Sequence, residues 1–161
     1  MTCIECGFSY DAALDVPTLI TAGVSELAAV LTTAEDLRSR RSPETWSPLE
    51  YACHVRDMLL VQRERVLLAR RVETPDCTPM GRDERVEHDG YADQNPADVA
   101  RQLSDAALLF TNVLRRLTAA AWAFTVLYRY PEPTERTLHW VALHTLHEVQ
   151  HHLLDVQRQL T

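Results

Sequence analysis

The sequence predicts an all-α protein: one domain, residues 1–161, folded as an antiparallel four-helix bundle. Three observations predict this fold class. Apolar residues recur at three- and four-residue steps in four long segments, strand-like alternation is scarce, and the chain has no internal repeat. With 161 residues, 46% of them hydrophobic, the chain is long enough to bury one sizeable core.

The first two helices are predicted from their periodicity and their start signals. Apolar residues recur from about 17 to 34, and Pro17 stands at the start of this segment. Ser47 is followed by Pro-Leu-Glu, which supplies a capping serine, a proline at the first helical position and a glutamate at the third. We therefore expect the second helix to run from there to about Arg71.

The rest of the chain predicts a long connection and two more helices. Residues 72–95 hold two prolines and two glycines and show no sustained period, which is typical of a long loop. Asn95, followed by a proline, predicts a third helix that ends near Leu117. The stretch AAWAFTVLYRYPEP is ambiguous, and its end predicts a turn into a last helix from about Thr134 to Leu160.

Composition excludes some classes of partner. The formal net charge of −7 and the absence of a Lys/Arg cluster with aromatic neighbours argue against nucleic-acid binding. The N-terminal sequence lacks the basic and apolar regions of a signal peptide, and no segment reaches the ~18 uninterrupted apolar residues of a membrane span. We therefore expect a cytoplasmic protein with no membrane partner.

An N-terminal extension, residues 1–15, carries a C-x-x-C pair. Cys3 and Cys6, followed by Gly7 and Phe8, have the spacing of a single zinc knuckle. A four-sulfur site needs a second knuckle, which the sequence does not contain. Two free thiols at a frayed terminus, a redox pair and a pair of metal ligands therefore remain alternatives.

Helical phase selects one inward-facing pair from the histidine-rich stretch LHTLHEVQHHLLDV, residues 143–156. At ~100° per residue, with Val149 at the centre of the apolar stripe, His152 falls about 60° away and Glu148 about 100° away. The two stand one turn apart on the same edge of the stripe. Asp155, one turn beyond His152, is expected to orient that histidine or to be an ordinary edge carboxylate.

The second helix offers a partner for this pair. His54 lies about 100° from the centre of its apolar stripe, again on an edge. We predict that His54, Glu148 and His152 form a three-ligand metal site across the bundle, with positions left for water or substrate. Two imidazoles and one carboxylate suit zinc, and also iron, nickel or manganese.

The letters HEVQH also read as HExxH, the zinc-protease motif. Helical phase places His147 and His151 about 160° from the apolar stripe, so we expect both to face solvent, which argues against a protease. A structural alternative uses the same pair. Together with Cys3 and Cys6, they would make a closed tetrahedral zinc site if the N-terminal segment folded over the outer face of the last helix.

The long loop supplies candidates for substrate recognition. Arg82, Arg85 and Tyr91 are expected at the mouth of the pocket, where the arginines would bind an anionic substrate. A charged loop that is merely solvated is the alternative. Cys53, next to His54, projects about 160° from its helix's stripe and is interpreted as incidental rather than as a nucleophile.

The motif W-S-x-x-x-x-x-x-H in WSPLEYACH, together with Glu148-x-x-x-His152-x-x-Asp155, resembles the DinB-like superfamily of metal-binding four-helix bundles. Within it the likeness is greatest to the mycothiol-dependent maleylpyruvate isomerase branch. The resemblance implies a divalent metal on His54, Glu148 and His152, and we expect this metal to be zinc. It also implies a homodimer and a transferase or isomerase that uses a low-molecular-weight thiol such as mycothiol on a small electrophile. The alternative is a non-catalytic metal-binding or redox- and stress-responsive protein that uses the C-x-x-C segment.

Overall fold

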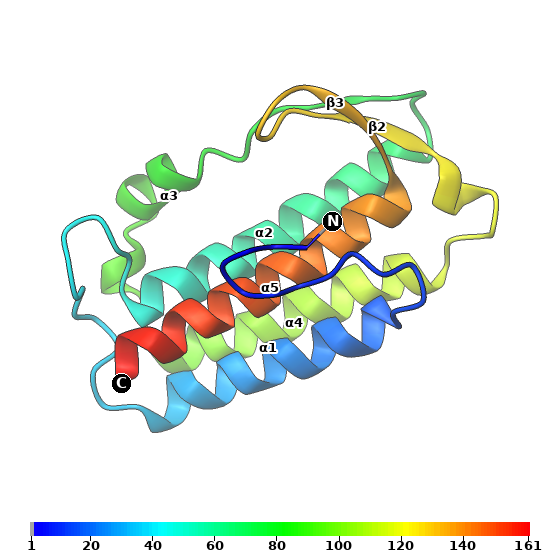
Figure 1. Ribbon diagram of the computed structural model, residues 1–161. Helices are drawn as coiled ribbons and strands as arrows, with labels where there is room; N and C mark the ends of the chain where they lie inside the picture. The colour runs from blue at the N-terminus through cyan, green and yellow to red at the C-terminus, as the bar shows by residue number, and fades with distance from the viewer. Residues whose placement is uncertain (1) are drawn as a thin grey trace.

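The computed structural model of the protein describes residues 2–161, and within these residues four long helices form a bundle (Figure 1). The helices are α1 (Val16–Thr33), α2 (Pro48–Ala69), α4 (Pro96–Arg115) and α5 (Leu138–Leu160). The predicted all-α bundle is confirmed, and the first three helices lie within two residues of their expected bounds.

Side-chain caps explain where the helices begin. Ser47 and Glu50 form both halves of the predicted capping box at α2, and Asn95 accepts backbone hydrogen bonds at the start of α4. The start expected for the last helix near Thr134 is wrong. Residues Thr134–Thr137 form a strand, and the side chain of Thr137 caps α5 by accepting from the backbone of Trp140.

The order of the helices around the bundle places α1 diagonally opposite α2. Each of these two packs against both α4 and α5. Figure 1 shows that α1 and α5 run in one direction and that α2 and α4 run in the other. The neighbouring pairs α1/α4 and α2/α5 are therefore antiparallel, whereas α2/α4 and α1/α5 are parallel. A parallel α2/α4 pair requires a connection as long as the bundle, which accounts for the long loop after α2.

This long connection contains short regular elements that the sequence did not predict. They are strand β1 (Asp76–Cys77), helix α3 (Arg82–His88) and a 3-10 turn at Tyr91–Asp93. None of the seven residues of α3 is buried, so the helix carries no apolar stripe that a periodicity search could detect.

A small sheet joins the connection to the start of α5. Its order is β1–β2–β3, where β2 is Thr125–Tyr128 and β3 is Thr134–Thr137. Strand β1 is parallel to β2, with Cys77 opposite Tyr128, and β2 is antiparallel to β3. A 3-10 turn, Ala121–Ala123, precedes β2. The ambiguous stretch of sequence thus forms the centre of this sheet.

The core fills the space between the four long helices. Its largest fully buried apolar side chains include Ile20, Leu27, Leu49, Leu59, Leu103, Phe110, Leu114, Leu138 and Leu146. Helix α1 approaches α5 closely at Gly23, where a Cβ atom would lie 2.9 Å from Cγ1 of Val149. Val149, expected at the centre of the apolar stripe, is completely buried.

By length and composition alone, α1 is apolar enough to cross a membrane. In the structure its apolar face, including Ile20, Val24 and Leu27, is buried against α4 and α5. This is the environment of a core helix in a bundle.

Candidate metal centre

Three predicted ligands meet between two helices. His54 comes from α2, and Glu148 and His152 come from α5; their ligand atoms all lie within 4.8 Å of one another. Nε2 of His152 is 3.5 Å from Oε2 of Glu148, and the rings of His54 and His152 are 5.0 Å apart between centroids. The structure therefore brings the predicted set together across the antiparallel α2/α5 pair.

His54 has an unsatisfied polar atom at this point. The residue is only 4% exposed, and its Nδ1 has no hydrogen-bond partner within residues 2–161. Burial, reinforced by the nearby His152, lowers the pKa of His54 to about 3. The indole of Trp46 packs on the His54 ring at 5.2 Å between centroids. His54 is therefore a neutral imidazole in a fixed position, which is the protonation state that binds metals.

Asp155 holds the ring of His152. Its Oδ2 lies 3.0 Å from Nδ1 of His152, which leaves Nε2 directed toward Glu148. Burial alone would lower the pKa of His152, but hydrogen bonds to Asp155 and Glu148 raise it. Burial would likewise raise the pKa of Glu148, yet the neighbouring His147 and His152 lower it. Glu148 is therefore an ionised carboxylate, as a metal ligand must be.

His144 extends this edge of α5 by one more turn. Its Nε2 is 4.0 Å from Oε1 of Glu148, and its Nδ1 is 3.0 Å from the hydroxyl of Tyr10. Burial lowers the pKa of His144 to about 4, so the imidazole is neutral. The sequence analysis gave His144 no role. His144 and Glu148 are four residues apart, as are Glu148 and His152. The same helical spacing that predicted the pair Glu148 and His152 would therefore have predicted His144 as their neighbour.

A cavity of about 290 Å³ borders these residues. His54, His144 and Glu148 lie on one side of it. The remaining lining combines three arginines and two carboxylates with aromatic and apolar side chains: Arg65, Arg82, Arg129, Asp83, Glu84, Tyr128, Tyr130, Met58, Val61 and Met80 are among them. Such a lining suits a small molecule that carries both a charged or polar group and an apolar part.

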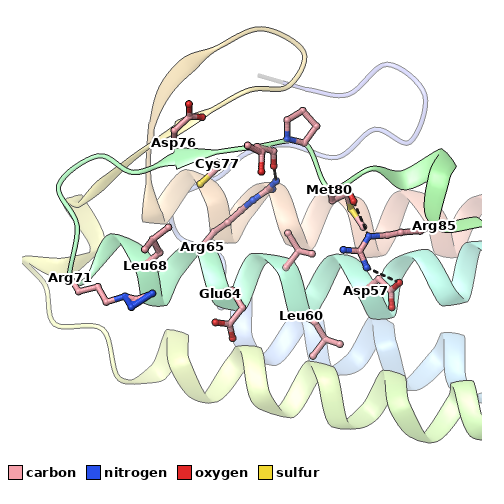
Figure 2. Close-up of a pocket in the computed structure, with 13 residues that line it drawn as sticks. Asp57, Leu60, Glu64, Arg65, Leu68, Arg71, Asp76, Cys77, Met80 and Arg85 are labelled. Carbon is pink, nitrogen blue, oxygen red and sulfur yellow. Dashed lines mark hydrogen bonds and ion pairs between the residues drawn. The ribbon is translucent and has the colours of Figure 1, made fainter. Parts of the chain in front are cut away.

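The three loop residues expected at the pocket mouth occupy different places. Arg82 lines the cavity. Arg85 lies in a neighbouring outer groove of about 490 Å³, where it donates to the carbonyl of Met80 and pairs with Asp57 at 3.3 Å (Figure 2). The position expected for Tyr91 is wrong. Tyr91 is completely buried and donates its hydroxyl hydrogen to Asp57 at 2.6 Å, because the turn that carries it packs against α2.

Arg65 is a cavity residue that the sequence analysis missed. It extends from α2 to the carbonyl of Thr78 (Figure 2). Its guanidinium lies 5.0 Å from the ring centre of Tyr128. It lines both the cavity and the outer groove. Both contacts are with segments distant in sequence, so no local pattern marks this arginine.

The N-terminal segment covers the outer face of α5, as Figure 1 shows for the dark-blue chain. The ring of Phe8 lies 5.4 Å from that of His147, and His151 contacts Glu5 at 3.4 Å. The expectation that His147 and His151 face solvent is therefore wrong, because residues 2–10 fold back over them. Neither histidine is among the residues that line the cavity, so the structure gives the protease interpretation no support.

Cys53 is completely buried, with its sulfur 3.6 Å from the side-chain oxygen of Gln94. Burial raises the pKa of the Cys53 thiol to about 12. A thiol in this state is a poor nucleophile, in keeping with the interpretation of Cys53 as incidental.

Comparisons with known proteins agree with this architecture. The family model of the DinB superfamily matches residues 21–156. YfiT from Bacillus subtilis, described as a probable metal-dependent hydrolase with an unusual four-helix bundle topology, superposes with a TM-score of 0.77 at 18% identity, over 89% of this chain and 83% of YfiT. The mycothiol-dependent maleylpyruvate isomerase superposes with a TM-score of 0.72 at 18% identity, over 88% of this chain and 59% of the isomerase. The comparison with curated proteins gave no significant match.

Proposed function

We propose that this chain, which belongs to the DinB superfamily, holds one divalent metal ion between His54, Glu148 and His152. The observation that carries the proposal is the buried, unpartnered Nδ1 of His54 beside an ionised glutamate and an oriented histidine. Two imidazoles and one carboxylate are the ligands of many catalytic zinc sites, which keep a further position open. Zinc is the metal we propose, and nickel, iron or manganese would suit the same donors.

We propose that the reaction is the transfer of a low-molecular-weight thiol, such as mycothiol, to a small electrophile, or an isomerisation that depends on such a thiol. When bound, a divalent metal supplies a Lewis acid that lowers the pKa of a thiol or of water. The chain supplies the binding surface. Arg65 and Arg82 are placed to hold an anionic group, and Met58 and Val61 offer apolar contacts. Arg129 is already paired with Asp76.

His144 is a further polar group of the site that can contact a bound molecule. It lines the cavity, it is neutral, and Tyr10 fixes its ring through the contact at Nδ1. Its Nε2 lies 4.0 Å from Oε1 of Glu148, where a molecule bound in the cavity can reach it. With its pKa lowered to about 4 this imidazole is a weak base, so we propose that it forms a hydrogen bond with the bound molecule and does not accept its proton.

A thiol-consumption assay tests the proposal. Protein loaded with zinc is mixed with mycothiol, bacillithiol or glutathione and a small electrophile such as an unsaturated acid. Metal-dependent, saturable loss of thiol, or thiol-dependent isomerisation of the electrophile, is expected from the wild type and from His88→Ala, a control that removes an exposed histidine at the end of α3. His54→Ala and chelated protein should lose this activity. No metal-dependent turnover with any of the three thiols would contradict the proposal.

Metal-dependent hydrolysis is the second candidate, favoured by the structural likeness to YfiT. It predicts turnover of ester or amide substrates without an added thiol.

A non-catalytic role in metal binding or redox sensing predicts that the protein binds metal but turns over neither kind of substrate. It also predicts that the Cys3–Cys6 segment responds to oxidants. The same protein preparation distinguishes the three outcomes.

We also propose that the protein is a cytoplasmic homodimer. None of the cysteines within residues 2–161 forms a disulfide, which is the state favoured in a reducing compartment. Helix α4 exposes Leu108 and Leu109, by 66% and 45%, and Leu109 borders a groove together with Leu60 of α2. Light scattering of the wild type should give the mass of a dimer, and Leu108→Glu should give a monomer. A monomeric wild type would exclude this interface.

A further inference from the structure

The N-terminal segment folds into a tight hairpin around its two cysteines. The backbone N–H of Gly7 donates to the carbonyl of Cys3 at 2.9 Å, and the N–H of Cys3 donates to Phe8 at 2.8 Å. Gly7 has a φ of +73°, a conformation in which side chains are rare. A turn of this kind lets two thiols separated by two residues reach one metal ion.

Two histidines of α5 complete a four-residue cluster with these cysteines. The ligand atoms of Cys3, Cys6, His147 and His151 all lie within 4.8 Å of one another. His147 and His151 are one helical turn apart, with ring centroids separated by 5.4 Å. The cluster shares no residue with the set at His54.

One ring nitrogen of each of these histidines lacks a partner. Nε2 of His147 and Nδ1 of His151 are buried, and neither has a hydrogen-bond partner in the part of the chain that the structure describes. Leaving a buried polar group unsatisfied costs about 1–3 kcal/mol. Two such atoms, one from each histidine, beside two thiols indicate that a ligand belongs there.

A carboxylate lies beside the second ring nitrogen of each histidine. Nδ1 of His147 lies 3.2 Å from Glu148, and Nε2 of His151 lies 3.4 Å from Glu5. Metal-binding histidines usually present their second ring nitrogen to a carboxylate or a carbonyl. This arrangement leaves Nε2 of His147 and Nδ1 of His151 for a metal ion.

We propose that Cys3, Cys6, His147 and His151 hold a structural zinc ion that fastens residues 2–10 to α5. Two thiolates and two imidazoles make a closed, four-coordinate set of the kind that structural zinc sites use, and the two thiol protons are released to solvent on binding. Phe8, only 7% exposed, covers the cluster from the hairpin side by packing on His147.

The structural zinc would also fix a residue that contacts the cavity wall. The segment that it fastens carries Tyr10, which contacts His144 on the cavity wall. The two metal sites also share a carboxylate, because Oδ2 of Asp155 lies 3.6 Å from His151 and 3.0 Å from His152. Loss of the structural zinc should therefore weaken metal binding at His54 without abolishing it.

Metal analysis tests the proposal on protein loaded with zinc under reducing conditions and then desalted. We expect about two equivalents of zinc in the wild type and about one in either the Cys3→Ala/Cys6→Ala or the His54→Ala variant. Cys77→Ala, which removes a buried thiol from β1, is the matched control and should keep about two equivalents.

Cobalt substitution gives a readout that does not depend on stoichiometry. The wild type and His54→Ala should show the near-ultraviolet charge-transfer absorption of cobalt bound to thiolate, and the double cysteine variant should lack it. If His54→Ala changes nothing while the cysteine variant loses all metal, the proposed catalytic centre fails and the structural site stands.

The opposite results would overturn the proposal. One such result is a single equivalent that His54→Ala removes, with Cys3 and Cys6 both open to alkylation. Another is a disulfide between the two cysteines that persists after loading under reducing conditions, shown by the mass of the intact protein. Absence of the thiolate absorption from cobalt-loaded wild type would also overturn the proposed structural zinc site.

Discussion

Oδ2 of Asp155 lies 3.0 Å from Nδ1 of His152, one turn earlier on α5. This contact fixes the ring so that Nε2 is directed toward Glu148, and such partners typically contribute 10- to 100-fold to metal affinity. We therefore expect Asp155→Asn to weaken zinc binding at His54, Glu148 and His152 by roughly 10- to 100-fold.

Competition with a chromophoric chelator measures this change. Because Asp155 also lies near His151, the experiment is best done in the Cys3→Ala/Cys6→Ala background, where the second cluster cannot bind metal. Asp105→Asn, an exposed carboxylate on α4, is the matched control. An affinity that Asp155→Asn leaves unchanged would show that His152 needs no such support.

Gly23→Ala should destabilise the bundle. In most helix interiors this substitution stabilises by about 1 kcal/mol, but here the new Cβ would lie 2.9 Å from Val149. Overpacking of this kind costs about 1–3 kcal/mol, which reverses the usual sign. Urea unfolding should show the loss, and Val149→Ala should reduce the effect of Gly23→Ala in a double-mutant cycle. Stabilisation by Gly23→Ala alone would mean that α1 and α5 are further apart.

Glu50→Gln should change how stability depends on pH. Burial raises the pKa of Glu50, but the hydrogen bonds from Arg40 and Ser47 outweigh it and lower that pKa below its ordinary value. A carboxylate whose pKa is lowered in the folded state stabilises the fold above its unfolded pKa, and this contribution is lost as the pH falls.

The substitution should therefore lower the free energy of unfolding by about 1–3 kcal/mol near pH 7, and by much less near pH 3. Chemical denaturation at several pH values measures it, with Glu26→Gln, an exposed glutamate on α1, as the control. An equal loss at both ends of the range would mean that the charge of Glu50 is not involved.

Arg82→Gln should weaken the binding of anionic substrates. Arg82 lines the cavity beside the proposed metal, and its side chain is 55% exposed, so its charge is screened by solvent. We expect a loss of kcat/KM worth about 0.5–1 kcal/mol for substrates that carry a carboxylate, and none for neutral analogues. Arg101→Gln, on the exposed face of α4, should change neither. Equal losses for both classes of substrate would show that Arg82 does not recognise the charge of the substrate.

The proposed metal ligands could be predicted because they depend on local geometry. Glu148 and His152 share a helix edge by their four-residue spacing, and His54 lies on an edge of a helix whose start is marked by Ser47. Helical phase thus selected His54, Glu148 and His152, three residues whose ligand atoms the folded chain brings within 4.8 Å.

The remaining features depend on contacts between distant segments. Tyr91 was placed at the pocket mouth because it follows a charged loop, yet it is buried against Asp57 of α2. His147 was placed in solvent by the phase of its own helix, which carries no information about the hairpin that covers it. The small sheet was missed because strand β1 has two residues and β2 and β3 have four each, too few to establish a period.

The proposed ligand set at His54 is tested most directly by anomalous diffraction from crystals of zinc-loaded protein, recorded on both sides of the zinc absorption edge. The account predicts an anomalous peak within bonding distance of His54, Glu148 and His152, next to the cavity. A peak held instead by the neighbouring group of His144, His147 and Glu148, or no peak beside His54, would contradict it.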